Sequence, residues 1–235
     1  MLAGTLGTLV GGGGLLAVPI LILLGLPPHA AIATNRLGST GVFAAGWYKF
    51  HNKGLVDYEL ASKTGIPFVL GSIIGSRIML EVDESVLRKA VAVITLVLLA
   101  AVMARSDMGL VKRLSKNRMR SVAGMFFCML TGVYAGFYGP GFAMFLSYIL
   151  ILVFGQTFIE SAATWKIPAL LHALLTSVLF ACYDLISYSA AAALFAGTFA
   201  GSYAGAHYSD RIGNVWYKRI FFTVVMIMSL KLIVW

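Results

Sequence analysis

The chain is a succession of long apolar stretches separated by short polar connectors. In order, the candidate membrane-spanning segments are residues 2–24, 28–50, 58–80, 86–104, 122–154, 157–181, 188–206 and 215–234. A helix needs about 20 apolar residues to cross the roughly 30 Å hydrocarbon core of a bilayer. We therefore expect an all-α integral membrane protein with about seven or eight membrane segments.

The composition agrees with this expectation and excludes other classes. Of the 235 residues, 60% are hydrophobic and 11% are charged, with a mean hydropathy of +0.89, whereas soluble domains carry about 25% charged residues. Disordered, collagen-like and disulfide-scaffold chains are excluded by the same numbers. The net charge is +9, but no aromatic or fold motif for nucleic acid accompanies it, so we expect no nucleic-acid partner.

The second half of the sequence repeats the first. Pairs related by an offset of 130 include Gly25/Gly155, Thr34/Thr164, Arg36/Lys166, Phe50/Phe180, Tyr58/Tyr188, Gly71/Gly201 and Gly75/Gly205. A long ungapped match of this kind indicates a duplication. We interpret residues 1–104 as a first transmembrane repeat and 121–235 as a second, joined by a basic cytoplasmic linker at 105–120.

The distribution of basic residues favours inverted repeats. With the linker in the cytoplasm, the inverted arrangement places 12 of the 18 Lys and Arg inside and leaves Arg77, Arg88, Lys89 and Lys231 outside. The parallel arrangement gives ten against six, which fits the positive-inside rule less well. Each repeat would then contain a glycine-broken re-entrant or split helix and three transmembrane helices, a common construction of secondary transporters.

Glycine clusters interrupt one segment in each half. Gly11, Gly12, Gly13 and Gly14 stand in the first segment, and Gly139, Pro140 and Gly141 stand in the fifth. Four successive glycines are not expected to stay helical, because glycine costs up to about 1 kcal/mol relative to alanine in a helix. Unwound backbone and helix N-termini at membrane depth attract anions; the alternative is a tight helix-packing point. The pairs Gly71/Gly75 and Gly132/Gly136 predict small-residue faces for close helix packing.

Two basic residues lie near the centre of their predicted segments. Arg36 is eight residues past Pro28 and Lys166 nine past Thr157, which places both roughly 12–14 Å into the membrane at 1.5 Å per residue. A central cation costs on the order of 2.5–3.5 kcal/mol, so we expect a shared midplane anion site, to which Thr34, Asn35, Thr164 and Trp165 would contribute. The alternatives are an ion pair with Glu160 or Asp184, or snorkelling to the interface.

Other chemistry is scarcely represented. His172, six residues past Lys166 with Pro168 between them as a predicted kink, is a candidate proton relay, although a hydrogen-bonded structural histidine is the alternative. No carboxylate pair, His/Cys cluster or serine nucleophile motif occurs on one predicted helix face, and Gly11–Gly14 lacks the lysine of a phosphate loop. We therefore expect no catalytic residues, no metal site and no cofactor, and a protein that is not an enzyme.

Residues 11–35, Gly-Gly-Gly-Gly-Leu-Leu-Ala-Val-Pro-Ile-Leu-Ile-Leu-Leu-Gly-Leu-Pro-Pro-His-Ala-Ala-Ile-Ala-Thr-Asn, resemble the sulfite exporter TauE/SafE family. The resemblance continues through 54–58 and 71–76, and is weaker in the second half. It implies a multi-pass transporter of small anions, with sulfite, organosulfonates and related sulfur compounds or carboxylates as substrates. By position, the family's glycine-rich break falls on Gly11–Gly14 and its Ala-x-Ala-Thr element on 31–34. Arg36, Pro140 and Trp165-Lys166 depart from the family pattern.

The combined expectation is an inner-membrane, multi-pass carrier that binds a small anion at the midplane and works by alternating access. Expected partners are the anion, the lipid bilayer, a coupling proton or sodium ion, and a second copy in a homodimer. The alternatives are an anion channel or a non-transporting membrane scaffold subunit.

Overall fold

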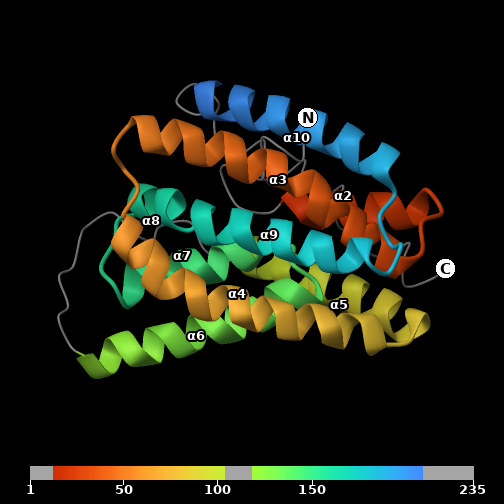
Figure 1. Cartoon of the computed structure of the whole chain (residues 1–235), viewed down its shortest axis with the longest axis horizontal. Helices are drawn as coiled ribbons and strands as arrows, with labels where there is room; N and C mark the ends of the chain where they lie inside the picture. The colour runs from red at the N-terminus through yellow and green to blue at the C-terminus, as the bar shows by residue number, and fades with distance from the viewer. Residues whose placement is uncertain (1–12, 104–117, 209–235) are drawn as a thin grey trace.

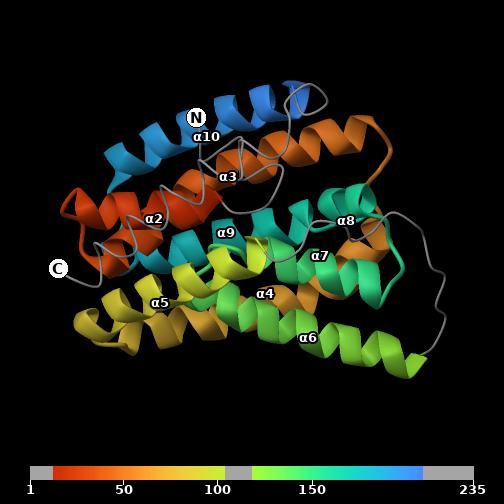
Figure 2. The same cartoon turned by 180° about the vertical axis from the view of Figure 1, so that it is seen from behind.

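The protein is a bundle of helices that run side by side along the longest axis of the molecule (Figures 1 and 2). The structure, a computed structural model, describes residues 13–103 and 118–208. Its helices are α2 (Gly13–Leu23), α3 (Pro28–Asn52), α4 (Tyr58–Glu81), α5 (Glu84–Met103), α6 (Arg118–Phe137), α7 (Phe142–Leu152), α8 (Phe158–Thr164), α9 (Lys166–Ala181) and α10 (Tyr188–Tyr208). No strand occurs within these residues, so the prediction of an all-α protein is confirmed for them.

The predicted segments coincide closely with the observed helices. Segments 28–50, 58–80, 86–104 and 188–206 match α3, α4, α5 and α10 to within a few residues. By length and hydropathy, two stretches of the described chain could each cross a membrane, Met119–Phe137 and Ile159–Ala181. The predicted segment 215–234 lies outside the described residues, as does most of the predicted linker, whose last residues form the beginning of α6.

The predicted segment 157–181 is not one continuous helix. It is interrupted at Trp165, between α8 and α9, rather than at Pro168 itself. Proline has no N–H and cannot donate to the carbonyl four residues earlier, so the missing bond is the one to the Thr164 carbonyl. The break therefore falls one turn before the proline that causes it.

Two short helices stand in equivalent places of the two halves. α2 and α7 have 11 residues each, too few to span a bilayer. The break at Gly139, Pro140 and Gly141 is confirmed, since α6 ends at Phe137 and α7 begins at Phe142. In the first half the prediction is wrong in part, because Gly13 and Gly14 are helical. Gly11 and Gly12 lie outside the described residues.

Equivalent helices of the two halves point in opposite directions. In Figure 1, α3 runs from right to left, whereas α8 and α9 run from left to right. α4 runs from left to right and α10 from right to left, and α2 and α7 lead away from the middle of the bundle toward opposite ends, as Figure 2 also shows. The N-terminal ends of α2 and α7 consequently face the centre of the molecule.

The two halves interlock through glycine faces. α4 of the first half packs on α6 of the second, and α3 packs on α10. A Cβ built on Gly75 would overlap the Val133 carbonyl oxygen, and one built on Gly136 would overlap that of Ser72; Gly71 and Gly132 meet the opposite backbone in the same way. The predicted close packing through Gly71/Gly75 and Gly132/Gly136 is therefore confirmed, with the two backbones in direct contact.

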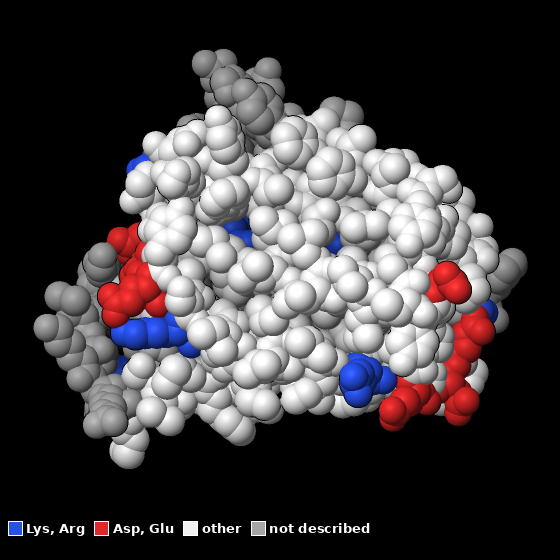
Figure 3. All heavy atoms as spheres, viewed as in Figure 1, with Lys and Arg blue, Asp and Glu red and all other residues white. Residues whose placement is uncertain are grey.

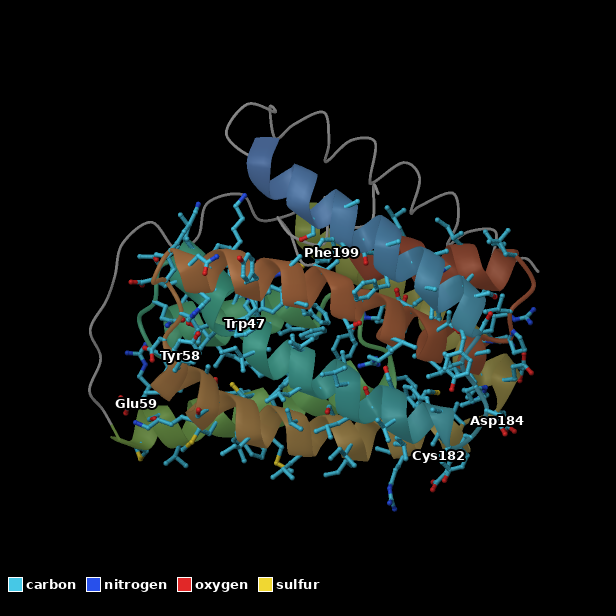
Figure 4. All side chains as sticks on the ribbon, turned by 45° about the horizontal axis from the view of Figure 1, so that its top comes forward. Trp47, Tyr58, Glu59, Cys182, Asp184 and Phe199 are labelled. Atoms are coloured by element: carbon cyan, nitrogen blue, oxygen red, sulfur yellow. The ribbon has the colours of Figure 1, made fainter. Side chains whose placement is uncertain are left out.

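The surface has an uncharged belt between two charged ends. Figure 3 shows red and blue side chains gathered at the left and right of the molecule, with an almost wholly uncharged face between them. Figure 4 places Glu59 at one end and Asp184 at the other. Large apolar side chains of α4, α6 and α9 are exposed along this belt, among them Leu70, Phe126 and Leu175. An exposed apolar band between polar ends is the arrangement that a bilayer requires.

Candidate functional site

A cavity of about 50 Å³ lies in the middle of the bundle, where α2 and α7 begin. This central pocket is roomy enough for a few water molecules. It is lined by residues from both halves, Gly13, Gly14, Ala17, Asn35, Arg36, Ser39, Val42, Phe43, Gly139, Pro140, Gly141, Phe142, Ala143, Trp165, His172 and Thr198. Because helix N-termini carry a positive partial charge, the start of α7, whose N-cap Gly141 lines the cavity, makes its surroundings favourable for an anion.

The turn between α6 and α7 forms one wall of the central pocket. Gly139 and Gly141 have φ values of +95° and +87°, which side chains other than glycine rarely allow. The Tyr134 hydroxyl donates a hydrogen bond to the Pro140 carbonyl and holds the turn from within α6. A Cβ built on Gly14 would lie 3.0 Å from Pro140 Cγ, so the tips of the two glycine breaks touch each other.

Arg36 supplies the charge of the central pocket. Its side chain is 4% exposed, and its guanidinium donates to the Gly136 carbonyl at 3.3 Å and to His172 Nε2. A Cβ on Gly139 would lie 3.0 Å from Arg36 Nη2, so a glycine at this turn leaves room for the guanidinium. α3 therefore presents a fixed cation to the cavity.

His172 fixes the position of Arg36. Since a guanidinium can only donate, His172 Nε2 accepts, and the ring proton is on Nδ1. The imidazole packs edge-on against Phe68 and Phe142, with ring centroids 5.3 and 5.6 Å away. His172 Nδ1 is buried and has no hydrogen-bond partner within the described residues. The geometry bears out the hydrogen-bonded reading of this histidine; its role as a proton relay stays a prediction.

Carboxylates are absent from the buried interior of the described residues. The buried polar side chains include Arg36, Lys166 and His172 but no Asp or Glu. The Glu160 carboxylate closes a capping box with Thr157 at the start of α8, accepting from its backbone N–H at 2.9 Å, and Asp184 is exposed. An ion pair of either cation with Glu160 or Asp184 is therefore not formed, and deep burial rules out snorkelling.

Lys166 lies near the central pocket but does not line it. Its side chain is 0% exposed, and its Nζ has no hydrogen-bond partner in the described chain. The ammonium lies 4.0 Å from the centroid of the Trp165 ring and 6.0 Å from that of Phe43, a cation–π arrangement. Trp165 and Phe43 both line the central pocket, so their aromatic rings lie between the Lys166 ammonium and the pocket that Arg36 faces.

The remaining predicted residues divide into two groups. Asn35 and Trp165 line the central pocket together with Gly13, Gly14, Gly139, Pro140 and Gly141. Thr34 and Thr164 do not: the Thr34 hydroxyl accepts from the Ser187 backbone N–H, and the Thr164 hydroxyl accepts from Gln156 Nε2, each at 3.0 Å. The two threonines thus tie α3 and α8 to neighbouring segments. Gly11 and Gly12 lie outside the described residues.

Sequence reasoning missed part of the lining. Ser39, Val42 and Phe43 follow Asn35 and Arg36 at spacings of three, four and seven residues along α3, so helical periodicity would have placed them on the same face. Thr198 of α10 has no such signal, because it reaches the pocket only through the packing of α10 on α3, where its hydroxyl donates to the Gly38 carbonyl at 2.9 Å.

Metal ligation finds no support in the described residues, where no group of three or more His, Cys, Asp or Glu side chains could hold an ion. What the central pocket offers is hydrogen-bond donors and positive charge in an apolar, aromatic-walled space. A small anion, with a charge to match and oxygens to accept, is the ligand chemistry that such a site recognises.

An all-helical bundle with an apolar belt and a buried central pocket between two half-helices defines the protein as a helical membrane protein of the transporter class. The sulfite exporter TauE/SafE family model matches residues 1–232, and the chain belongs to this family. This confirms the resemblance found in the sequence and places the protein in a membrane.

Among curated proteins, the chain is similar to a "Probable membrane transporter protein" of Haemophilus influenzae, with 24% identity over 200 residues that cover 83% of this chain and 76% of the relative. It is also similar to "Probable membrane transporter protein YfcA" of Escherichia coli, with 26% identity over 171 residues. That match covers 71% of this chain and 62%, less than two thirds, of the relative. No solved structure matches the chain.

Proposed function

We propose that the protein is a multi-pass carrier that moves a small anion across the inner membrane by alternating access. The anion binds in the central pocket, held by Arg36 and by the N-terminal ends of α2 and α7. Candidate substrates are sulfite, an organosulfonate or a related sulfur-containing or carboxylate anion. The observation that carries the proposal is a buried guanidinium beside a cavity, with no carboxylate buried among the described residues to neutralise it.

The repeats of this carrier are inverted. Three observations support this: the offset of 130 in the sequence, the opposite directions of equivalent helices (Figure 1), and the two half-helices that begin at the central pocket. Lys49, Lys53 and Lys63 stand near the end at which α6 begins, which agrees with a cytoplasmic position for the basic linker. Rocking of one repeat against the other would expose the pocket to each side in turn.

An anion channel and a non-transporting scaffold are the competing functions. The central pocket is small, about 50 Å³, and lies between two half-helices, which is the place of the substrate site in secondary transporters and favours a carrier. The family to which the chain belongs favours transport over a scaffold. A coupling proton or sodium ion and a homodimer stay predictions from the sequence.

Uptake of radiolabelled sulfite into proteoliposomes tests the proposal, with methanesulfonate and acetate as competitors. We expect uptake that saturates with substrate concentration, and counterflow when the liposomes are loaded with unlabelled anion. Linear, non-saturable flux would favour a channel. No flux above that of empty liposomes, from protein shown to be folded and for all three anions, would refute anion transport.

Replacement of His172 tests whether it relays protons. His172→Gln keeps an oxygen that can accept from Arg36 but cannot titrate, so we expect it to retain anion binding and to lose stimulation of uptake by a proton gradient. His172→Leu removes the acceptor and should lower the free energy of unfolding by about 1–3 kcal/mol. The measurement is uptake with and without an imposed pH gradient, and an unchanged response in His172→Gln would contradict the relay.

A further inference from the structure

Lys166 is a buried cation that the central pocket does not use. Its side chain is 0% exposed and its Nζ has no hydrogen-bond partner in the described residues. No acidic side chain is buried in that part of the chain. A charged group in this setting is costly unless an anion or a hydrogen-bond acceptor pairs with it, and among the described residues the ammonium faces only the aromatic rings of Trp165 and Phe43.

A second unpartnered donor accompanies the ammonium. Trp165 Nε1 is buried without an acceptor in the part of the chain that the structure describes, and so is Nε1 of Trp47. Trp47 follows Gly46, whose position directly faces Lys166: a Cβ built on Gly46 would lie 2.7 Å from Lys166 Cε and 3.2 Å from its Nζ. Figure 4 shows Trp47 on the side of α3 that faces α8 and α9. One buried acceptor also has no partner among the described residues, Oε1 of Gln156, whose Nε2 donates to the Thr164 hydroxyl. Against it stand three unpartnered donors, on Lys166, Trp165 and Trp47, and an oxyanion would match this excess of donors.

An aromatic wall separates this region from the central pocket. Phe43, Phe142 and Trp165 contact one another edge-on, with ring centroids 5.9 to 6.1 Å apart. The three rings line the pocket on one side, while Trp165 and Phe43 face the Lys166 ammonium on the other. Movement of Trp165, which stands at the break between α8 and α9, would join the two regions.

The internal repeat pairs the two cations but not their surroundings. At the offset of 130, Lys166 corresponds to Arg36, and Val42 corresponds to His172. Arg36 is held by His172 from the other half, whereas the equivalent contact to Lys166 would come from Val42, which cannot accept a hydrogen bond. Arg36 is thus anchored in place, whereas no described residue holds the Lys166 ammonium by a hydrogen bond.

We propose that Lys166 is a second anion station on the transport path, separated from Arg36 by the wall of Phe43, Phe142 and Trp165. The anion binds first at Arg36 in the central pocket and passes to Lys166 when Trp165 moves aside, with Nζ of Lys166 and Nε1 of Trp165 as donors. This inference rests on the proposed function, because a path needs a transported anion. It differs from the single shared site that the sequence predicts.

The variant Lys166→Met tests the second station, because it should slow transport in proteoliposomes without weakening anion binding at Arg36. Methionine keeps the length of the side chain and removes the charge, and removing an unpaired buried charge should leave the thermal midpoint in detergent unchanged or raised. We expect equilibrium binding of radiolabelled sulfite to stay close to that of the wild type. Equilibrium exchange, with equal sulfite on both sides, and net uptake should both slow at least about tenfold. Lys89→Met, an exposed lysine of α5, is the matched control and should change neither.

A second variant moves the charge without removing it. Gly46→Ala introduces a methyl group against Lys166 Cε and should displace the ammonium, slowing exchange while leaving binding at Arg36 intact. We expect Arg36→Met to lose sulfite binding. If Lys166→Met or Gly46→Ala lost binding to the same extent, Lys166 would belong to the first site and the second station would be overturned.

Exchange and net uptake distinguish the remaining roles. Loss of net uptake with exchange retained in Lys166→Met would mark a coupling group and overturn the station, because exchange requires passage of the anion but no net movement of a coupling ion. Unchanged exchange and uptake would overturn it as well. Wild-type protein that neither binds nor moves sulfite, methanesulfonate or acetate would instead overturn the proposed function, and the station with it.

Discussion

Arg36→Met is expected to abolish saturable anion uptake while leaving the protein folded. Hydrogen bonds to a charged group contribute about 1.5–3 kcal/mol each, so loss of the guanidinium should weaken anion binding at least tenfold, at about 1.4 kcal/mol per factor of ten. Equilibrium binding of radiolabelled sulfite in detergent and uptake into proteoliposomes both measure this loss.

Stability is expected to change little in the same variant. Arg36→Met leaves His172 Nε2 without its donor, at a cost of about 1–3 kcal/mol, but it also removes a buried charge that no buried carboxylate of the described residues pairs, and the relief of that burial offsets the cost. The Gly136 carbonyl keeps a hydrogen bond from the Ser76 hydroxyl at 3.2 Å. Arg77→Met makes the same chemical change at an exposed position of α4 and should retain uptake. Wild-type affinity in Arg36→Met would show that the central pocket does not bind the anion through this residue.

Much of this architecture is predictable from the sequence because a membrane imposes simple rules on it. An apolar run must reach a minimum length to span, so the bounds of α3, α4 and α10 follow from hydropathy. Glycine at positive φ marks the α6–α7 turn, and paired glycines mark the contact between α4 and α6. These signals are local, and each belongs to a short stretch of chain.

The part that sequence reasoning could not supply is the pairing of distant faces. Arg36 and His172 are 136 residues apart, and no periodicity indicates that they meet. Depth is predictable for Arg36 and Lys166, since both lie about the same distance along their helices, but depth does not say which way a side chain turns. Arg36 turns to the cavity, whereas Lys166 lies behind Trp165.

The break in the segment 157–181 lies one turn before the position that the sequence predicts for it. Pro168 predicts a disturbed helix, and the structure has the disturbance at Trp165. Proline disturbs the helix one turn before itself, because it cannot donate to the carbonyl four residues earlier. The correction bears on the proposed mechanism, since it places the break at the aromatic residue between the two cations.

Gly136→Ala is expected to lower both stability and anion affinity. The added methyl group would overlap the Ser72 carbonyl oxygen, and overpacking of this kind costs about 1–3 kcal/mol, more than the up to about 1 kcal/mol that alanine gains in helix propensity. Since the Gly136 carbonyl also accepts from Arg36 at 3.3 Å, parting α4 from α6 here would move the guanidinium. Thermal midpoints in detergent and sulfite binding measure the two effects.

Substitutions at two further glycines distinguish the effect of helix packing on stability from the effect of the position of Arg36 on anion affinity. Gly132→Ala overlaps the Phe68 carbonyl and should lower the thermal midpoint as much as Gly136→Ala does. Its effect on affinity should be smaller, because the Arg36 guanidinium donates to the Gly136 carbonyl, one turn further along α6. Gly65→Ala on α4 meets only the Pro168 side chain, 3.1 Å away, and should change stability least. Equal stability in all three variants would mean that α4 and α6 can move apart without cost. Their tight contact would then not be the rigid support on which the position of Arg36 depends.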